Sequence, residues 1–212
     1  MLRRAPRECG SWWWDLDDVT ETGLVPALGT AARMAAVLGK HALLEPSSLE
    51  WDWFERGRGG LGVHTRLGLM GSRLDDPELA EQARACRPVG HPAAEMSALL
   101  VTGPGERLDA EGEPRREPRL VELTVSPDPY GCWAEVAVHH DVWSPCDFGG
   151  EPHPAVHANN APRLAAALRA LDALLGVPGE PGEPTYFGVA EGHGLKAPEL
   201  VDGLGPDLTD LL

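Results

Sequence analysis

Two alternating segments, residues 121–125 and 132–142, constrain the fold of this chain more than any other part of it. In the first, apolar residues alternate with Glu122 and Thr124, and residues 126–131 then supply the prolines, aspartate and glycine of a turn. Alternation with a period of two is typical of a strand with one buried face, and a turn of this composition joins antiparallel neighbours. The sequence therefore predicts a β-hairpin within an antiparallel or mixed sheet.

The second segment sorts its residues onto two faces. The more apolar face carries Cys132, Ala134, Val136, Val138, His140 and Val142. The other face carries Trp133, Glu135, Ala137, His139 and Asp141. Because successive side chains of a strand point to opposite sides, we expect His140 to face the core and His139 and Asp141 to face outward or into a cleft.

Two segments before the hairpin have the signals of helices. Residues 25–38 place their apolar side chains on one helical face, and Gly39 follows where a C-terminal glycine belongs. A shorter helix is predicted from Asp76, with Pro77 in its first position, to about Cys86. Shorter apolar or alternating runs predict strands at residues 12–16, 61–69 and 96–101.

A last helix follows the hairpin. Asn159 or Asn160 is expected to cap it, Pro162 to occupy its first turn, and a stripe of leucines to run to Gly176. The prolines on either side of His153 predict extended backbone before that cap. Strands and helices that alternate around a firm hairpin favour an α+β fold, a two-layer sandwich with helices on one face of the sheet.

The chain is expected to form one domain over residues 1–178. Within it, residues 103–119 are rich in proline, glycine and charge, and predict an exposed, mobile loop. Residues 179–212 begin with two Gly-Glu-Pro units, which predict a semi-rigid spacer and a tail that can pack back on the domain.

Charge limits the classes of partner. The formal net charge of −15 repels phosphate backbones, so nucleic-acid binding is not expected, and it attracts basic proteins. No apolar run approaches the roughly 18 residues of a membrane span, so no membrane association is expected. Four cysteines without paired spacing and an N-terminus without an apolar leader predict a cytoplasmic protein. Sixteen arginines against two lysines, with abundant alanine, glycine and proline, indicate a GC-rich bacterial source.

Tryptophan and acidic residues gather in two segments that could anchor a basic partner, because exposed indoles beside carboxylates engage cations. The predicted partner-binding residues are Trp12, Trp14, Asp15, Asp17, Asp18, Trp51, Asp52, Trp53 and Glu55. Three consecutive tryptophans cannot all be buried on one strand face, so at least one is expected at an edge, pocket or interface. Burial of the indoles under the helix and tail is the alternative.

Residues 139–157 hold four of the eight histidines of the chain and form the second candidate site. Imidazole, carboxylate and thiolate are the donors that zinc and iron use, so the metal candidates are His139, Asp147, His153 and His157. The catalytic candidates are His139, Asp141 and Cys146. No metal-ligand spacing or catalytic motif surrounds these residues, and ordinary structural histidines are the alternative.

Three functions remain open from the sequence, one of which is a scaffold or accessory subunit that would oligomerise through a flat apolar surface. The first is an acidic, cytoplasmic, bacterial interaction protein of the immunity or inhibitor type, which binds a basic partner and needs no cofactor. The alternative is a small enzyme that uses zinc or iron, or a His/Asp acid–base pair, within residues 139–157. The oligomeric state stays undetermined.

Overall fold

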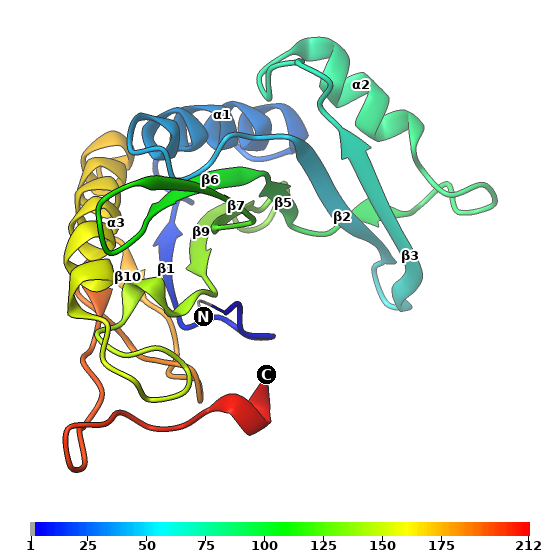
Figure 1. The fold of residues 1–212 in the computed structure, drawn as a ribbon. Coiled ribbons are helices and arrows are strands. Elements are labelled where there is room, and N and C mark those ends of the chain that lie inside the picture. The colour runs from blue at the N-terminus through cyan, green and yellow to red at the C-terminus, as the bar shows by residue number, and fades with distance from the viewer. Residues whose placement is uncertain (1–2) are drawn as a thin grey trace.

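An eight-stranded antiparallel sheet forms the centre of the computed structural model, which describes residues 3–212 (Figure 1). The hydrogen-bonded order is β10-β1-β9-β8-β5-β2-β3, and β4 also pairs with β2. The strands are β1 (Gly10–Asp15), β2 (Ser48–Glu55), β3 (Gly59–Gly68), β4 (Glu95–Met96), β5 (Leu99–Thr102), β8 (Val121–Val125), β9 (Trp133–Val138) and β10 (Glu180–Pro181). The predicted hairpin is confirmed as β8 and β9, which pair from Val121 with Val138 to Val125 with Ala134.

Helices cover one face of this sheet, which confirms the predicted α+β class. They are α1 (Leu24–Lys40), α2 (Pro77–Ala85) and α3 (Pro154–Leu175). Figure 1 shows α1 lying across the sheet, α3 at the edge formed by β1 and β10, and α2 beside β2 and β3. The side chain of Asp76 accepts a hydrogen bond from the Glu78 amide, so the predicted start of α2 is confirmed.

The core lies between the sheet and these helices. Alternate residues of β1, β2, β8 and β9 point to the helices and are fully buried, among them Trp12, Trp14, Trp51 and Trp53. The indole nitrogen of Trp14 donates to Asp172 of α3 at 2.8 Å, and that of Trp12 donates to the carbonyl of Gly192 at 2.6 Å. Burial of these rings removes a large apolar area from water.

The expectation of a mobile loop at residues 103–119 is wrong. This segment forms a second hairpin of β6 (Pro104–Leu108) and β7 (Pro114–Pro118). Its base is held by the Glu45 amide, which donates to the Pro104 carbonyl at 2.8 Å, and its tip is held by α3. Polar composition predicted disorder, but contacts with distant parts of the chain satisfy the backbone of this hairpin.

Asn160 of α3 fastens the tip of that hairpin. Asp109 donates its amide to the Glu113 carbonyl, so the neighbouring pair, Leu108 and Pro114, is the one without ladder hydrogen bonds. The amide and carbonyl of Leu108 therefore point away from β7. The carboxamide of Asn160 meets both, at 2.8 Å and 2.7 Å, and is fully buried.

The predicted start of the last helix is also wrong. The helix begins at Pro154, where a proline loses no hydrogen bond because the first amides of a helix have no intrahelical acceptor. Asn159 and Asn160 lie inside it rather than at its cap, and Pro162 lies within the continuous helix on an exposed side rather than in its first turn. Its end is confirmed, since Gly176 adopts the left-handed conformation at φ 76°.

Smaller departures concern the strand ends and the tail. The strand expected at residues 96–101 divides into β4 and β5, and β9 ends at Val138. Beyond α3, β10 pairs with β1, and Phe187 packs edge-on against Phe148 with ring centres 5.6 Å apart. The remaining short elements are η1 (Asp141–Trp143), β11 (Ala190–Glu191), β12 (Gly194–Leu195) and η2 (Thr209–Leu211). Within residues 3–212, no helix is both long and apolar enough to span a membrane.

Candidate functional site

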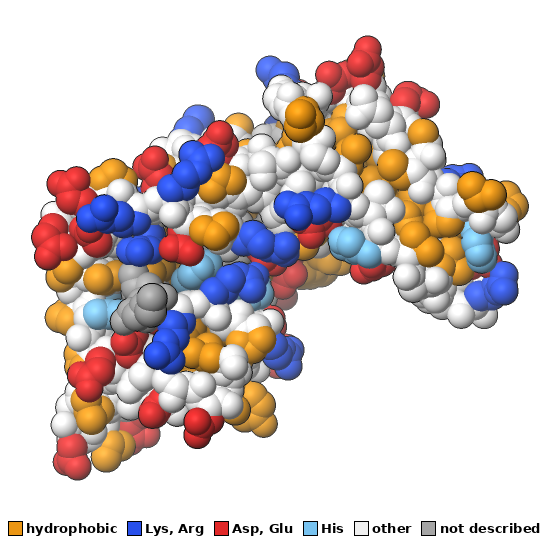
Figure 2. All heavy atoms as spheres, turned by 45° about the vertical axis from the view of Figure 1, so that its right-hand side comes forward, with side chains coloured by type: hydrophobic (Ala, Val, Ile, Leu, Met, Phe, Trp, Pro, Cys, Tyr) orange, Lys and Arg blue, Asp and Glu red, His pale blue; other side chains and the backbone are white. Residues whose placement is uncertain are grey.

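The face of the sheet opposite the helices, called the open face below, carries a connected network of ion pairs and hydrogen bonds. Period-two alternation places on it Trp13 from β1, Glu50 from β2, Glu122 from β8, and both Trp133 and Glu135 from β9. In the space-filling view, lysine and arginine side chains gather in a band across the middle, with many acidic side chains at the left and upper margins (Figure 2).

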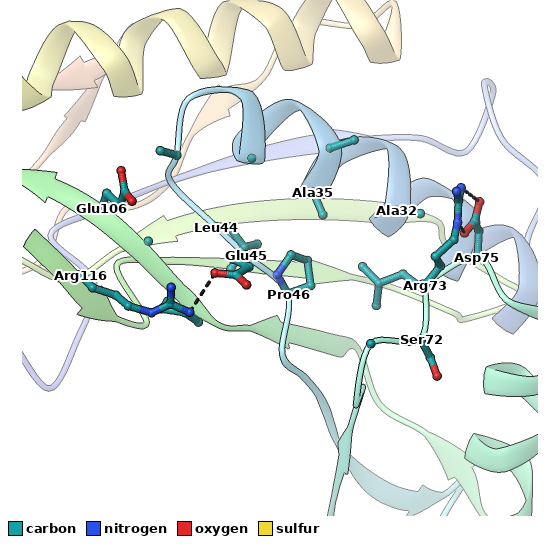
Figure 3. Close-up of a pocket in the computed structure, with 17 residues that line it drawn as sticks. Ala32, Ala35, Leu44, Glu45, Pro46, Ser72, Arg73, Asp75, Glu106 and Arg116 are labelled. Carbon is teal, nitrogen blue, oxygen red and sulfur yellow. Dashed lines mark hydrogen bonds and ion pairs between the residues drawn. The ribbon is translucent and has the colours of Figure 1, made fainter. Parts of the chain in front are cut away.

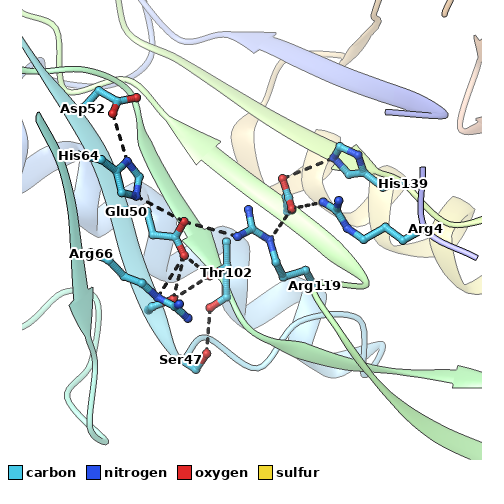
Figure 4. A network of polar contacts seen from close by, with 11 residues as sticks. Arg4, Ser47, Glu50, Asp52, His64, Arg66, Thr102, Arg119 and His139 are labelled. Atoms are coloured by element: carbon cyan, nitrogen blue, oxygen red, sulfur yellow. Dashed lines mark hydrogen bonds and ion pairs between the residues drawn. The ribbon is translucent and has the colours of Figure 1, made fainter. Parts of the chain in front are cut away.

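Arg119, just before β8, joins Glu122 and Glu50, two of the acids of the open face (Figure 4). Its Nε donates to Glu122 at 2.7 Å and its Nη1 to Glu50 at 3.5 Å. Arg4 approaches Glu122 from the N-terminal segment at 2.6 Å, and Arg66 of β3 approaches Glu50 at 3.4 Å. Guanidinium and carboxylate groups thus alternate across neighbouring strands.

The environment of Glu122 keeps its carboxylate ionised. Burial by itself would raise the pKa, but contacts with His139, whose Nε2 lies 3.4 Å away, and with Arg119 lower it to about 2. Burial lowers the pKa of nearby His140 to about 4, against the opposing effect of Glu117. At neutral pH Glu122 is therefore charged, and the buried His140, near Glu117, is neutral.

Hydroxyl groups complete the surroundings of Glu50. Ser48 and Thr102 donate to its Oε1 at 3.3 Å and 3.0 Å. His64 of β3 lies between Glu50, at 3.9 Å, and Asp52, at 3.1 Å. Every oxygen of this buried carboxylate thus has a polar neighbour, which is the condition for burying a charge.

The β1 end of the open face, called the Trp–acid end below, consists of Trp13, Trp133, Asp15, Glu135 and Glu180. Trp13 lies directly between Glu135 of β9 and Glu180 of β10, and Trp133 lies opposite Asp15. Both indoles are half-buried. Side chains that face each other across antiparallel strands are about 4.5–5.5 Å apart at Cβ, so each indole adjoins a carboxylate.

The carboxylates of the Trp–acid end lack basic partners. Within the described residues, Asp15, Glu135 and Glu180 take part in none of the ion pairs. Burial raises the pKa of Glu135 above its usual range, Ser11 opposes this effect, and the carboxylate of Glu8 adds to it. A cation placed here would relieve the unfavourable ionisation of Glu135.

The expectation that Trp12, Trp14, Trp51 and Trp53 anchor a partner is wrong. All four rings are buried under the helices, because alternation turns them to the apolar face of the sheet. The indoles that reach the surface of the sheet are Trp13 and Trp133. Trp13 is the middle one of three consecutive tryptophans, so its side chain points to the opposite face from Trp12 and Trp14. This was the sequence signal that Trp13 reaches the surface.

The acids predicted beside those tryptophans differ in exposure and in their contacts. Asp15, Asp17 and Asp18 are exposed at the end of β1, and Asp17 accepts a hydrogen bond from the Cys132 amide. Asp52 contacts His64. Glu55 is buried and contacts His91 and Arg58, each at 2.9 Å. The exposed acids Asp17 and Asp18 therefore follow closely after Asp15 of the Trp–acid end.

The metal candidates do not converge. His139 contacts Glu122, His153 donates its Nε2–H to the Ser144 carbonyl at 2.7 Å, and Asp147 accepts from the amides of its own turn. His157 lies on α3, one turn after His153. In residues 3–212, no group of three or more histidine, cysteine or acidic side chains is arranged to hold a metal ion, so the expected zinc or iron arrangement is not formed.

The catalytic candidates are likewise separated. Because β9 ends at Val138, Asp141 does not share a strand face with His139, as the sequence had indicated. Instead it is buried in η1 and accepts from the amides of Arg3, at 3.2 Å, and Phe148, at 3.5 Å. Burial raises the pKa of Asp141, against these hydrogen bonds. Cys146 is buried beside Gly205 of the tail, so these residues hold segments together rather than face one reaction centre.

Two hollows lie away from the open face. The larger, about 660 Å³, is lined by Ala32, Ala35, Leu44 and Pro46, with the Arg116–Glu45 and Arg73–Asp75 ion pairs at its two ends (Figure 3). The smaller, about 350 Å³, lies under the tail and includes Cys146 and Asp147. The larger hollow contains none of the residues predicted as sites.

Comparisons of the chain with models of protein families, with curated proteins and with solved structures found no match.

Proposed function

We propose that the protein is an interaction protein of the immunity or inhibitor type, from the cytoplasm of a bacterium, that binds a basic protein through the Trp–acid end. The observation that carries this proposal is the unpaired state of Asp15, Glu135 and Glu180 around two half-buried indoles. An incoming lysine or arginine would contact an indole face and a carboxylate together, and each contact strengthens the other.

The electrostatics of the whole chain support the same direction. The formal charge of −15 draws a basic partner from solution, and most described arginines are already bound to acids within the molecule. The remaining carboxylates are therefore free to act on a partner. Electrostatic attraction of this kind accelerates association and orients the two proteins before contact.

A peptide of ten lysines provides a first test, with binding followed by tryptophan fluorescence. We expect Trp13→Leu to weaken its binding about tenfold, because the cation loses its aromatic contact at the centre of the site. Glu180→Gln should weaken it about threefold and reduce its dependence on salt. Glu180 is an exposed edge residue, so this second variant leaves the core intact.

The matched control is Glu111→Gln, an exposed acid in the turn between β6 and β7, which form a separate sheet from the one that carries the Trp–acid end. It removes the same charge and should leave binding unchanged. Equal weakening in this control and in Glu180→Gln would mean that net charge alone attracts the peptide. In that case the Trp–acid end is not the binding site.

A further inference from the structure

The open face carries a second group of side chains with the opposite charge. Its members, called the arginine row below, are Arg4, Arg119 and Arg66. Their side chains are 34%, 39% and 66% exposed, whereas those of Glu122 and Glu50, which hold them, are 11% and 8% exposed. Solvent and any partner therefore meet guanidinium groups first, although the chain as a whole is acidic.

The buried acids hold the guanidinium groups but do not use all of their donors. Arg119 employs Nε and Nη1, and its Nη2 has no partner among the described side chains. Arg66 approaches Glu50 through Nε. Because a guanidinium has five N–H donors in a fixed plane, the unused ones are already oriented for an acceptor. Little side-chain entropy would be lost when that acceptor arrives.

Solubility does not account for this arrangement. Two carboxylates are withdrawn from water beneath three arginines, and withdrawing a charge from water is unfavourable unless other interactions compensate. An exposed acidic surface would serve solubility without that cost. The arrangement instead places three of the sixteen arginines of the chain along one face, between β8 and β3 (Figure 4).

We propose that the arginine row binds carboxylate side chains of an acidic segment of a partner protein. This inference rests on the proposed function, since it assumes that a protein partner lies on the open face. The partner would then meet two regions of opposite charge on one surface. Charges of both signs fix the orientation of a complex, because the reversed orientation brings like charges together.

The length of the arginine row favours a chain segment over a single small anion. Arg4 pairs with Glu122 on β8, and Arg66 lies on β3, with β5 and β2 between these strands. Three strand spacings of about 4.8 Å give about 14 Å. One phosphate or carboxylate contacts one or two guanidinium groups, whereas an extended segment with several acidic residues reaches all three.

The test uses a peptide of six glutamates as probe, with inorganic tripolyphosphate as a parallel arm and both at low ionic strength. We expect the peptide to bind, and Arg66→Gln combined with Arg119→Gln to weaken it at least about tenfold. Arg66→Gln alone should weaken it about threefold. Arg66 makes one exposed contact, so this single variant should fold even if the double variant does not. Circular dichroism checks the fold of each.

The matched control is Arg169→Gln, which removes an exposed arginine of α3 on the other side of the sheet. It should bind the peptide as the unchanged protein does. The proposal is overturned if the glutamate peptide does not bind, if only tripolyphosphate binds, or if the control loses as much affinity as Arg66→Gln. The Trp13→Leu variant should bind glutamate normally, so failure here is distinct from failure of the lysine peptide at the Trp–acid end.

Discussion

Replacing Asn160 by leucine should lower the free energy of unfolding by about 3 kcal/mol. Leucine has nearly the same shape but cannot hydrogen-bond, so the amide and carbonyl of Leu108 would lose their partners at 2.8 Å and 2.7 Å. Pro114, opposite Leu108 on β7, has no amide to offer in exchange. Chemical denaturation measures the loss, and faster hydrogen exchange at the Leu108 amide locates it.

Asn159→Leu is the matched control for this substitution. The same residue type one position earlier makes a single hydrogen bond, from its Nδ2 to the Asp109 carbonyl at 2.8 Å, and is half-buried. We expect it to cost about 1 kcal/mol. Equal losses in the two variants would show that the hairpin of β6 and β7 is not held by Asn160 and that any polar residue in this turn of α3 contributes alike.

The stability of the protein should fall steeply between pH 4.5 and about 2, and Glu122→Gln should remove part of that fall. Glu122 titrates near 4.5 in an unfolded chain and near 2 when folded, so in this window the unfolded state binds more protons. Its contribution is complete above pH 4.5 and disappears as the pH falls through 2. We expect about 2 kcal/mol, which chemical denaturation at a series of pH values measures.

At pH 7 the Gln variant should therefore be less stable than the unchanged protein, and near pH 2 the two should converge. Glu111→Gln, on the exposed turn, should give a curve parallel to that of the unchanged protein. His140 contributes in a separate window, because an unfolded histidine gains its proton near 6.5 and His140 only near 4. If the Gln variant keeps the full slope below pH 4.5, the ion pairs of Glu122 do not stabilise the fold.

The local sequence pattern correctly predicted those elements whose turn, cap or alternation residues lie within a few positions of one another. The hairpin of β8 and β9, the start of α2 at Asp76 and the end of α3 at Gly176 were all found this way. Local pattern failed at residues 103–119 because the partners of that hairpin, Glu45 and Asn160, lie far away in the sequence. It failed at the start of α3 because a proline can either be the first residue of a helix, as Pro154 is, or follow extended backbone before a later helix.

The candidate site was predicted only in its residue types. Alternation of Glu122 with apolar neighbours placed it on the outer face of a strand, and the run of three tryptophans required one to turn away from the core. The sequence alone could not say that Trp13 stands between Glu135 and Glu180, nor that Arg119 joins Glu50 to Glu122. Trp13 lies 122 and 167 positions from Glu135 and Glu180, and Arg119 lies 69 positions from Glu50, so only the order of the strands brings them together.

The amino-acid sequence by itself therefore determined the class of fold, the faces of individual strands and the acidic charge of the chain. The strand faces and the fold class depend on the spacing of apolar residues along short segments, and the charge depends on the composition of the chain. Tertiary structure alone decided which tryptophans are buried, which acids have basic partners, and that arginines gather on one face of an acidic protein. Strand order and register set these outcomes, because a side chain acquires its environment only when distant strands pair.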